Sequence, residues 1–229
     1  MSLDSAIWVS PLQFLMGGSH GYRHQLYRFG PFRLGDAPAR AAHFYELSKQ
    51  AFAKKDTYWG FRFFACSLHY LEDLGQPLHN KPLTLAQIAM LGFNPRWIVN
   101  YAMNIHVAYE SYVARHLEKG DERFIEALQE SRSEDVQSIG EATGIMSDYS
   151  YSQASKLLQA SEEFWPARVR SKYRKSRPTE AEIFPVQYSP GQSKLDKITE
   201  ESLSATGGLM RGALERLQID ISPKYPQVD

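Results

Sequence analysis

The sequence has almost no cysteine and no excess of charge of either sign. Cys66 is the single cysteine among 229 residues, so no disulfide can form within the chain. The 26 basic and 26 acidic residues cancel, so no overall field draws the chain to nucleic acid or to an anionic membrane. No apolar run approaches the roughly 20 residues of a membrane-spanning helix. These absences exclude a disulfide-stapled scaffold and a strongly basic nucleic-acid binder, and they predict no transmembrane segment.

The sequence also lacks strand-like alternation, internal repeats and a convincing domain linker. Apolar residues make up 43% of the chain, an ordinary value for a globular protein. A length of 229 residues suffices for one sizeable domain. We therefore expect an all-α fold, a single helical bundle over 1–229. Within it we expect a metal-binding core over 4–116, C-terminal helices over 121–218 and a loose tail over 219–229.

Capping residues and helix breakers predict where the helices begin and end. Asp36 and Asp56 are good N-caps, and Asn94-Pro95 opens a long amphipathic segment that Gly120 stops. The ranges expected to be helical are 1–14, 37–54, 57–76, 84–90, 95–117, 121–129, 133–146, 151–164 and 195–217. We expect a break at 16–20, an aromatic and basic loop over 21–35 and an irregular excursion over 176–193. The Gly207-Gly208 pair either weakens the last helix or permits close packing.

The central stretch is Ser67-Leu-His-Tyr-Leu-Glu-Asp-Leu-Gly-Gln-Pro-Leu-His79. His69 and Asp73 stand four residues apart, so on a helix both side chains project from one face. Pro77 ends or kinks that helix, because it lacks an N–H and clashes with the preceding turn. The change of direction lets His79 approach the same place from another angle.

A second pair with the same spacing lies on a separate amphipathic segment. It consists of His106 and Glu110. One such pair alone more often marks a solvated helix face, but two pairs and a proline-positioned histidine among apolar residues indicate a metal site. Charged groups on apolar helix faces need partners, and a divalent ion supplies one. Imidazole and carboxylate ligands favour zinc.

The motif that ends at His79 resembles the central motif of the zinc-dependent bacterial phospholipases C. Fungal single-strand nucleases share their fold and a related motif. Ser19-His20-Gly-Tyr resembles the phospholipase segment that supplies an upstream histidine ligand, and residues 42–56 resemble the helix that leads into the motif. His106-Val-Ala-Tyr-Glu110 resembles the family's His-x-x-x-Glu element, where the nucleases tend to carry Asp. The resemblance therefore favours the phospholipase branch; it is good from His20 to Glu110, plausible for the final helix and weak between them.

The resemblance implies two zinc ions with three protein ligands each. One ion would be held by His20, His69 and Asp73, and the other by His79, His106 and Glu110. Relatives also use an aspartate upstream of the first histidine, as a ligand and as the proposed general base. Asp4, sixteen residues before His20, is the acidic residue in that position. The resemblance therefore names Asp4 and Asp73 as catalytic carboxylates and as metal ligands.

The sequence departs from the family pattern in two ways. Family enzymes bind a third zinc through the mature N-terminal amine and a nearby histidine, but no histidine precedes His20. Glu72 also replaces the small glycine common before the motif aspartate. We therefore expect two zinc ions, an incomplete third site and weak hydrolysis from the chain as given.

The function implied is zinc-dependent hydrolysis of a phosphodiester, with a phospholipid as the leading substrate. Two alternatives stay open, a single-strand nuclease or nucleotidase of the same fold and a metal-stabilised helical protein with little or no catalysis. Tyr22 and Tyr27 are expected to wall a head-group or base pocket. The resemblance further implies peripheral membrane contact and a secreted or extracytoplasmic location, although no signal peptide is recognisable.

Overall fold

The computed structural model describes residues 18–174, 176–184 and 190–222. The expected N-terminal helix over 1–14, and Asp4 with it, lie outside these residues. The described chain is predominantly helical, with 73% of residues in helices and one two-stranded hairpin. The expected all-α fold is confirmed. Among the described helices, none is both long and apolar enough to cross a membrane.

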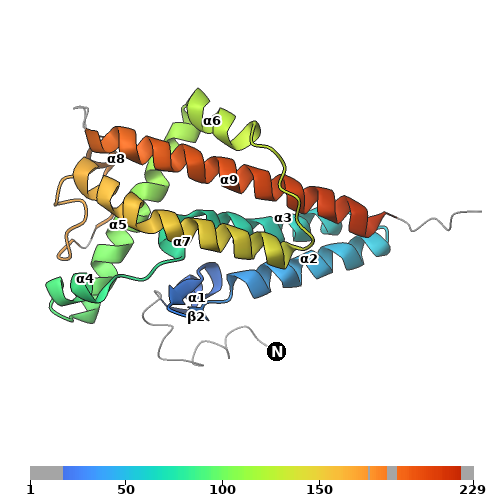
Figure 1. Cartoon of the computed structure of the whole chain (residues 1–229), viewed down its shortest axis with the longest axis horizontal. Coiled ribbons are helices and arrows are strands. Elements are labelled where there is room, and N and C mark those ends of the chain that lie inside the picture. Colours follow the sequence, from blue (N-terminus) through green and yellow to red (C-terminus); the bar gives the residue numbers. More distant parts are fainter. Residues whose placement is uncertain (1–17, 175, 185–189, 223–229) are drawn as a thin grey trace, which may run out of the picture.

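Figure 1 shows the order of the elements. The helices are α1 (Gly18–His24), α2 (Ala37–Ala53), α3 (Thr57–Gly75), the 3-10 helix η3 (Pro77–His79), α4 (Leu85–Met90), α5 (Pro95–Glu118), α6 (Glu122–Gln129), α7 (Ile139–Phe164), α8 (Glu180–Ile183) and α9 (Pro190–Ile221). Strands β1 (Tyr27–Phe29) and β2 (Phe32–Leu34) pair antiparallel between α1 and α2, with Tyr27 opposite Leu34. The helix α2 packs along α3, and α7 packs along α9.

Side-chain caps start several of these helices at the positions that the sequence predicts. The Asp56 carboxylate accepts a hydrogen bond from the Trp59 N–H at the start of α3. Asn94 caps α5, with Pro95 in its first turn. Thr84 and Gln87 form a reciprocal capping box at the start of α4. Such contacts satisfy N–H groups that have no partner within the helix.

The break after α3 redirects the chain toward the candidate site. Gln76 adopts an extended backbone, and Pro77 then begins the single turn of η3. The residue before a proline avoids helical backbone angles, so Gln76 and Pro77 together end α3. The Leu26 N–H donates to the His79 carbonyl oxygen at 2.9 Å. This bond ties η3 to the segment that follows α1.

In the second half of the described chain, two helices are longer than expected. The two helices expected over 133–146 and 151–164 are one continuous helix, α7, and residues 133–138 precede it. Ser147 and Ser150, which lie between the two expected helices, are buried within α7. The helix α7 contributes Met146 to one hydrophobic cluster and Leu157 to another. The prediction of a break was wrong because these small polar residues lie inside the packed interface rather than in a turn.

Three further boundaries differ from the expectation. Residues 18–20 of the break expected at 16–20 are helical, since α1 begins at Gly18. The expected loop over 21–35 holds the end of α1 and the β1–β2 hairpin, which turns at Gly30 with φ +57°. The final helix α9 starts at Pro190 and runs to Ile221, so 219–221 are helical rather than part of a loose tail.

Close packing at Gly207 explains the glycine pair in α9. A Cβ atom built on Gly207 would lie 2.2 Å from the carbonyl oxygen of Leu128, the penultimate residue of α6. The glycine therefore lets the end of α6 contact the backbone of α9. Figure 1 shows α6 lying over α9 on the face opposite α3.

Candidate metal centre

The first group of potential metal ligands joins α1 to α3. The Nδ1 atom of His24 lies 2.5 Å from Oδ2 of Asp73, and Nε2 of His69 lies 3.4 Å from the same oxygen. His69 and Asp73 come from successive turns of α3, as their spacing predicts, and His24 is the last residue of α1. One carboxylate oxygen thus faces two imidazole nitrogens. Such an arrangement can enclose a cation.

His24 occupies the place that the resemblance assigned to His20. Ligand atoms of His24, His69 and Asp73 all lie within 4.8 Å of one another. His20 lies one turn earlier on α1, exposed, with its ring centred 4.5 Å from the ring of His24. The four-residue spacing of His20 and His24 was visible in the sequence. This spacing did not predict a ligand pair, because the glycines before His20 predicted a break in the chain instead of a helix.

The second group joins η3 to α5. The Nε2 atoms of His79 and His106 lie 3.3 Å apart. Oε1 of Glu110 lies 3.0 Å from Nε2 of His106 and 3.8 Å from Nε2 of His79. The structure therefore brings together all three residues that the sequence predicts for this group. Its three facing atoms again lie within 4.8 Å of one another.

Burial keeps one ligand of the second group, His79, in its neutral form. His79 is only 5% exposed. Burial, and then the neighbouring His106, hold the pKa of His79 well below its ordinary value of 6.5. A neutral imidazole keeps a lone pair for a metal, whereas a protonated one does not.

Gln76 contacts His106 of the second group and the backbone of Leu78. Its Oε1 atom accepts a hydrogen bond from the Leu78 N–H at 2.6 Å. Its Nε2 atom lies 3.0 Å from Nδ1 of His106. Contacts to the second nitrogen of an imidazole fix the orientation of the ring. Gln76 therefore both starts η3 and positions His106.

Both groups line the same cavity. It has a volume of about 660 Å³ and is bordered by His69 and Asp73 of the first group and by His79 and Glu110 of the second. Its other walls are largely apolar and come from α3, α5, α6 and α9. These apolar lining residues are Leu68, Val113, Ala114, Leu117, Leu128, Leu203, Met210 and Leu214. Glu72 also lines the cavity, and burial raises the pKa of its carboxyl group.

The tyrosines expected to wall a pocket lie elsewhere. Tyr27 lines a second cavity of about 280 Å³ on the side of α4, α5 and α7, whereas Tyr22 lies outside the lining of both cavities. Burial raises the pKa of the Tyr27 hydroxyl to about 12. Asp4, the expected ligand and base, is outside the described residues. Of the two expected catalytic carboxylates, Asp73 is the one within the described residues.

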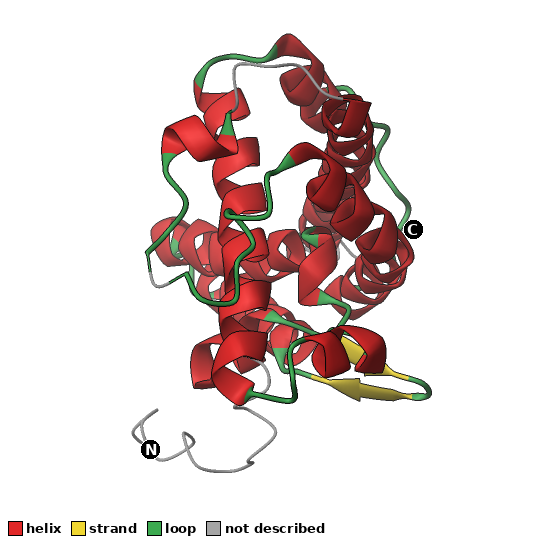
Figure 2. Cartoon of the chain, turned by 90° about the vertical axis from the view of Figure 1, so that its left-hand side faces the viewer, coloured by secondary structure: helices red, strands yellow, loops and turns green. Residues whose placement is uncertain are grey.

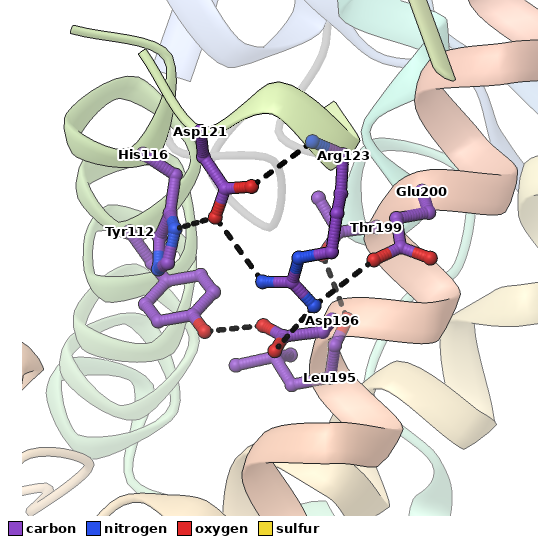
Figure 3. Close-up of polar contacts among 8 residues, drawn as sticks. All are labelled: Tyr112, His116, Asp121, Arg123, Leu195, Asp196, Thr199 and Glu200. Carbon is purple, nitrogen blue, oxygen red and sulfur yellow. Dashed lines mark hydrogen bonds and ion pairs between the residues drawn. The ribbon is translucent and has the colours of Figure 1, made fainter. Parts of the chain in front are cut away.

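A third cluster of polar residues does not have the metal-ligand arrangement of the two groups, because ion pairs with an arginine hold it together. Figure 3 shows Asp121 between the side chains of His116 and Arg123, and Arg123 reaching Asp196 and Glu200 of α9. The His116 Nδ1 to Asp121 Oδ2 distance is 2.7 Å. Arginine supplies the positive charge here, so the cluster ties α5 and α6 to α9 by ion pairs.

The two histidine and carboxylate groups are thus compatible with bound metal ions. Each offers two nitrogens and a carboxylate oxygen, and catalytic metal sites commonly use three protein ligands and leave one position open. The described residues form these two groups and no third. Comparison with protein-family models, with curated proteins and with solved structures found no match to this chain.

Proposed function

We propose that this chain is a zinc-dependent phosphodiester hydrolase of the phospholipase C type. The observation that carries the proposal is that two groups, each with two imidazoles and one carboxylate, border a single apolar-walled cavity. A mixed nitrogen and oxygen donor set of this size suits zinc. His24, His69 and Asp73 would hold one ion, and His79, His106 and Glu110 the other.

Zinc bound at these groups would supply Lewis acidity toward phosphodiester oxygens and lower the pKa of water. The residues of the chain itself have three tasks. His79 stays neutral through burial. Gln76 orients the His106 ring. A substrate that covers the apolar wall would exclude water, which strengthens electrostatic interactions in the site.

The chemistry of the wall favours a lipid over a nucleic acid. Proteins that bind single strands use grooves that combine positive charge with aromatic stacking platforms. Among the described residues that line the large cavity, Arg211 is the one arginine or lysine and Tyr109 the one tyrosine, phenylalanine or tryptophan. The Arg211 guanidinium is engaged by the carbonyl oxygen of Leu128 at 3.2 Å. Aliphatic side chains suit the acyl or glyceride part of a phospholipid instead.

The experiment compares three substrates on protein purified without chelator. Metal content is measured by elemental analysis, and hydrolysis is followed on short-chain phosphatidylcholine, bis(p-nitrophenyl) phosphate and single-stranded DNA. We expect zinc in the protein and the highest kcat/KM on the phospholipid. His79→Ala should remove activity, while His43→Ala, an exposed histidine outside both groups, should not. Protein without any divalent metal, or metal-loaded protein that acts on none of the three, would refute the proposal.

A further inference from the structure

The smaller cavity carries charges that the two metal-ligand groups do not use. It has a volume of about 280 Å³, and its lining includes Lys81 and Glu162. That volume is just below the range of typical drug-sized ligand pockets, so it suits a small molecule. His106 also lines it, so the cavity adjoins the second metal-ligand group.

Lys81 provides a cation that no carboxylate among the described residues neutralises. Its Nζ atom donates to Oγ of Ser155 at 2.7 Å and lies 5.0 Å from the centre of the Tyr151 ring. Neither contact removes the positive charge. A half-buried ammonium group in a cavity favours an anionic ligand, because water screens it less than at an open surface.

Glu162 provides the opposite charge in the same lining. Its Oε1 atom accepts a hydrogen bond from the Tyr101 hydroxyl at 2.8 Å and lies 3.5 Å from a nitrogen of Arg170. Both contacts use the same oxygen, which leaves Oε2 for an ammonium donor. Ser155 and Glu162 are seven residues apart on α7, so they lie on one face about 10 Å apart along the axis.

Gln25 adds an unsatisfied acceptor. Its side chain is 8% exposed and lines the cavity, and its Oε1 atom has no hydrogen-bond partner among the described residues. Buried polar atoms are nearly always paired, so an orphaned one indicates a missing donor. A ligand that carries N–H or O–H groups would supply it.

We propose that the small cavity binds a small zwitterion, with its anionic group at Lys81 and its ammonium group at Glu162. The cavity volume of about 280 Å³ limits the ligand to a short molecule that carries both charges. An amino group and a phosphate or carboxylate on a two-carbon chain form such a molecule. Phosphoethanolamine and β-alanine are the matching probes, one for each kind of anion.

The test measures dissociation constants by calorimetry on the full chain. We expect phosphoethanolamine or β-alanine to bind at least tenfold more tightly than ethanolamine and than ethyl phosphate or propionate, which each lack one charge. The zwitterion with the lower dissociation constant shows whether the site prefers a phosphate or a carboxylate. Binding should persist after a chelator has removed metal, which separates this site from the His groups and from the proposed hydrolase activity.

Variants locate the site. Lys81→Met should weaken zwitterion binding at least tenfold, and Glu162→Gln should weaken it while leaving ethyl phosphate or propionate unaffected. Lys156→Met and Glu163→Gln are matched controls, because both residues neighbour the site on α7 and lie outside the cavity lining. Equal affinity for the single-charge probes, loss of binding with chelator, or no response to either variant in folded protein would overturn the proposal.

Discussion

The Nε2 atoms of His79 and His106 face each other at 3.3 Å, and Glu110 approaches both. Two imidazole nitrogens converge in this way on a space that a cation can share. The pairing depends on the turn at Pro77, because His79 comes from η3 and His106 from α5.

Removing one ligand from each group should empty one site at a time. We expect His79→Ala to bind about one metal ion fewer per chain, and Asp73→Asn to lose the other ion, because each group has only three protein donors. Elemental analysis after gel filtration measures the stoichiometry. His43→Ala is the control. Loss of both ions from either variant would show that the groups form a single coupled site.

Replacing Gln76 by glutamate should strengthen metal binding at the second group. A metal on Nε2 of His106 requires a proton on Nδ1, and Gln76 offers that atom an N–H₂ group rather than an acceptor. A carboxylate would accept from His106 and from the Leu78 N–H together. We expect affinity to rise by about tenfold, measured by chelator competition.

The control for that experiment is Gln129→Glu, which adds the same charge to the lining of the large cavity away from His106. A general effect of charge would raise the affinity of both variants equally. Such a result would contradict a specific role for the contact between Gln76 and His106.

The metal-free protein should lose stability as the pH falls below 6.5. Burial lowers the pKa of His79 in the folded state, so the unfolded chain binds more protons in this range. The free energy of unfolding then decreases by up to about 1.4 kcal/mol per pH unit for this group. Urea titrations between pH 7 and 5 should show a shallower dependence in His79→Gln. His43→Gln should retain the slope of the parent chain.

Gly207→Ala should destabilise the fold, and Gly144→Ala should not. The new methyl group at residue 207 would meet the Leu128 carbonyl oxygen at 2.2 Å, whereas nothing lies within 4 Å at residue 144. We expect a loss of about 1–3 kcal/mol for the first change. The second should gain about 0.5–1 kcal/mol, because alanine favours a helix interior. Equal effects in thermal or urea unfolding would contradict the close contact of α6 with α9.

Asp196→Ala should cost more stability than Tyr112→Phe. The fully buried Tyr112 donates to Oδ1 of Asp196 at 2.5 Å, and Arg123 lies 3.4 Å from its other oxygen (Figure 3). Loss of the acid strands a buried hydroxyl at a cost of about 1–3 kcal/mol. The phenylalanine variant leaves Asp196 paired with Arg123. A double-mutant cycle measures the coupling, and additive losses would argue against the hydrogen bond.

Local rules predicted the elements that carry the ligands. Asp56 and Asn94 cap α3 and α5 as expected, and the four-residue spacings bring His69 to Asp73 and His106 to Glu110. These features depend on residues within one or two helical turns. Local spacing therefore predicts the pair His106 and Glu110, whereas the family resemblance supplied the grouping of that pair with His79 of η3.

The features that were missed depend on long-range packing. His24 joins Asp73 only because a helix begins at Gly18 in spite of its glycines. Ser147 and Ser150 are buried in α7 because that helix contacts α9 and α2, which no local pattern indicates. The large cavity likewise needs walls from α6 and α9, far along the chain from the motif.

Figure 2 shows the end of the molecule at which α5 crosses the long helices. The ligands of both groups come from α1, α3, η3 and α5, whereas Leu203 and Met210 of α9 wall the cavity above them. At ribosomal speeds of about 5–20 residues per second, the hundred residues from Glu110 to Met210 take roughly 5–20 seconds to add. During that interval the ligand residues have been synthesised and the residues of their apolar wall have not. A metal ion bound by these groups would therefore have access to their side chains before α9 is made.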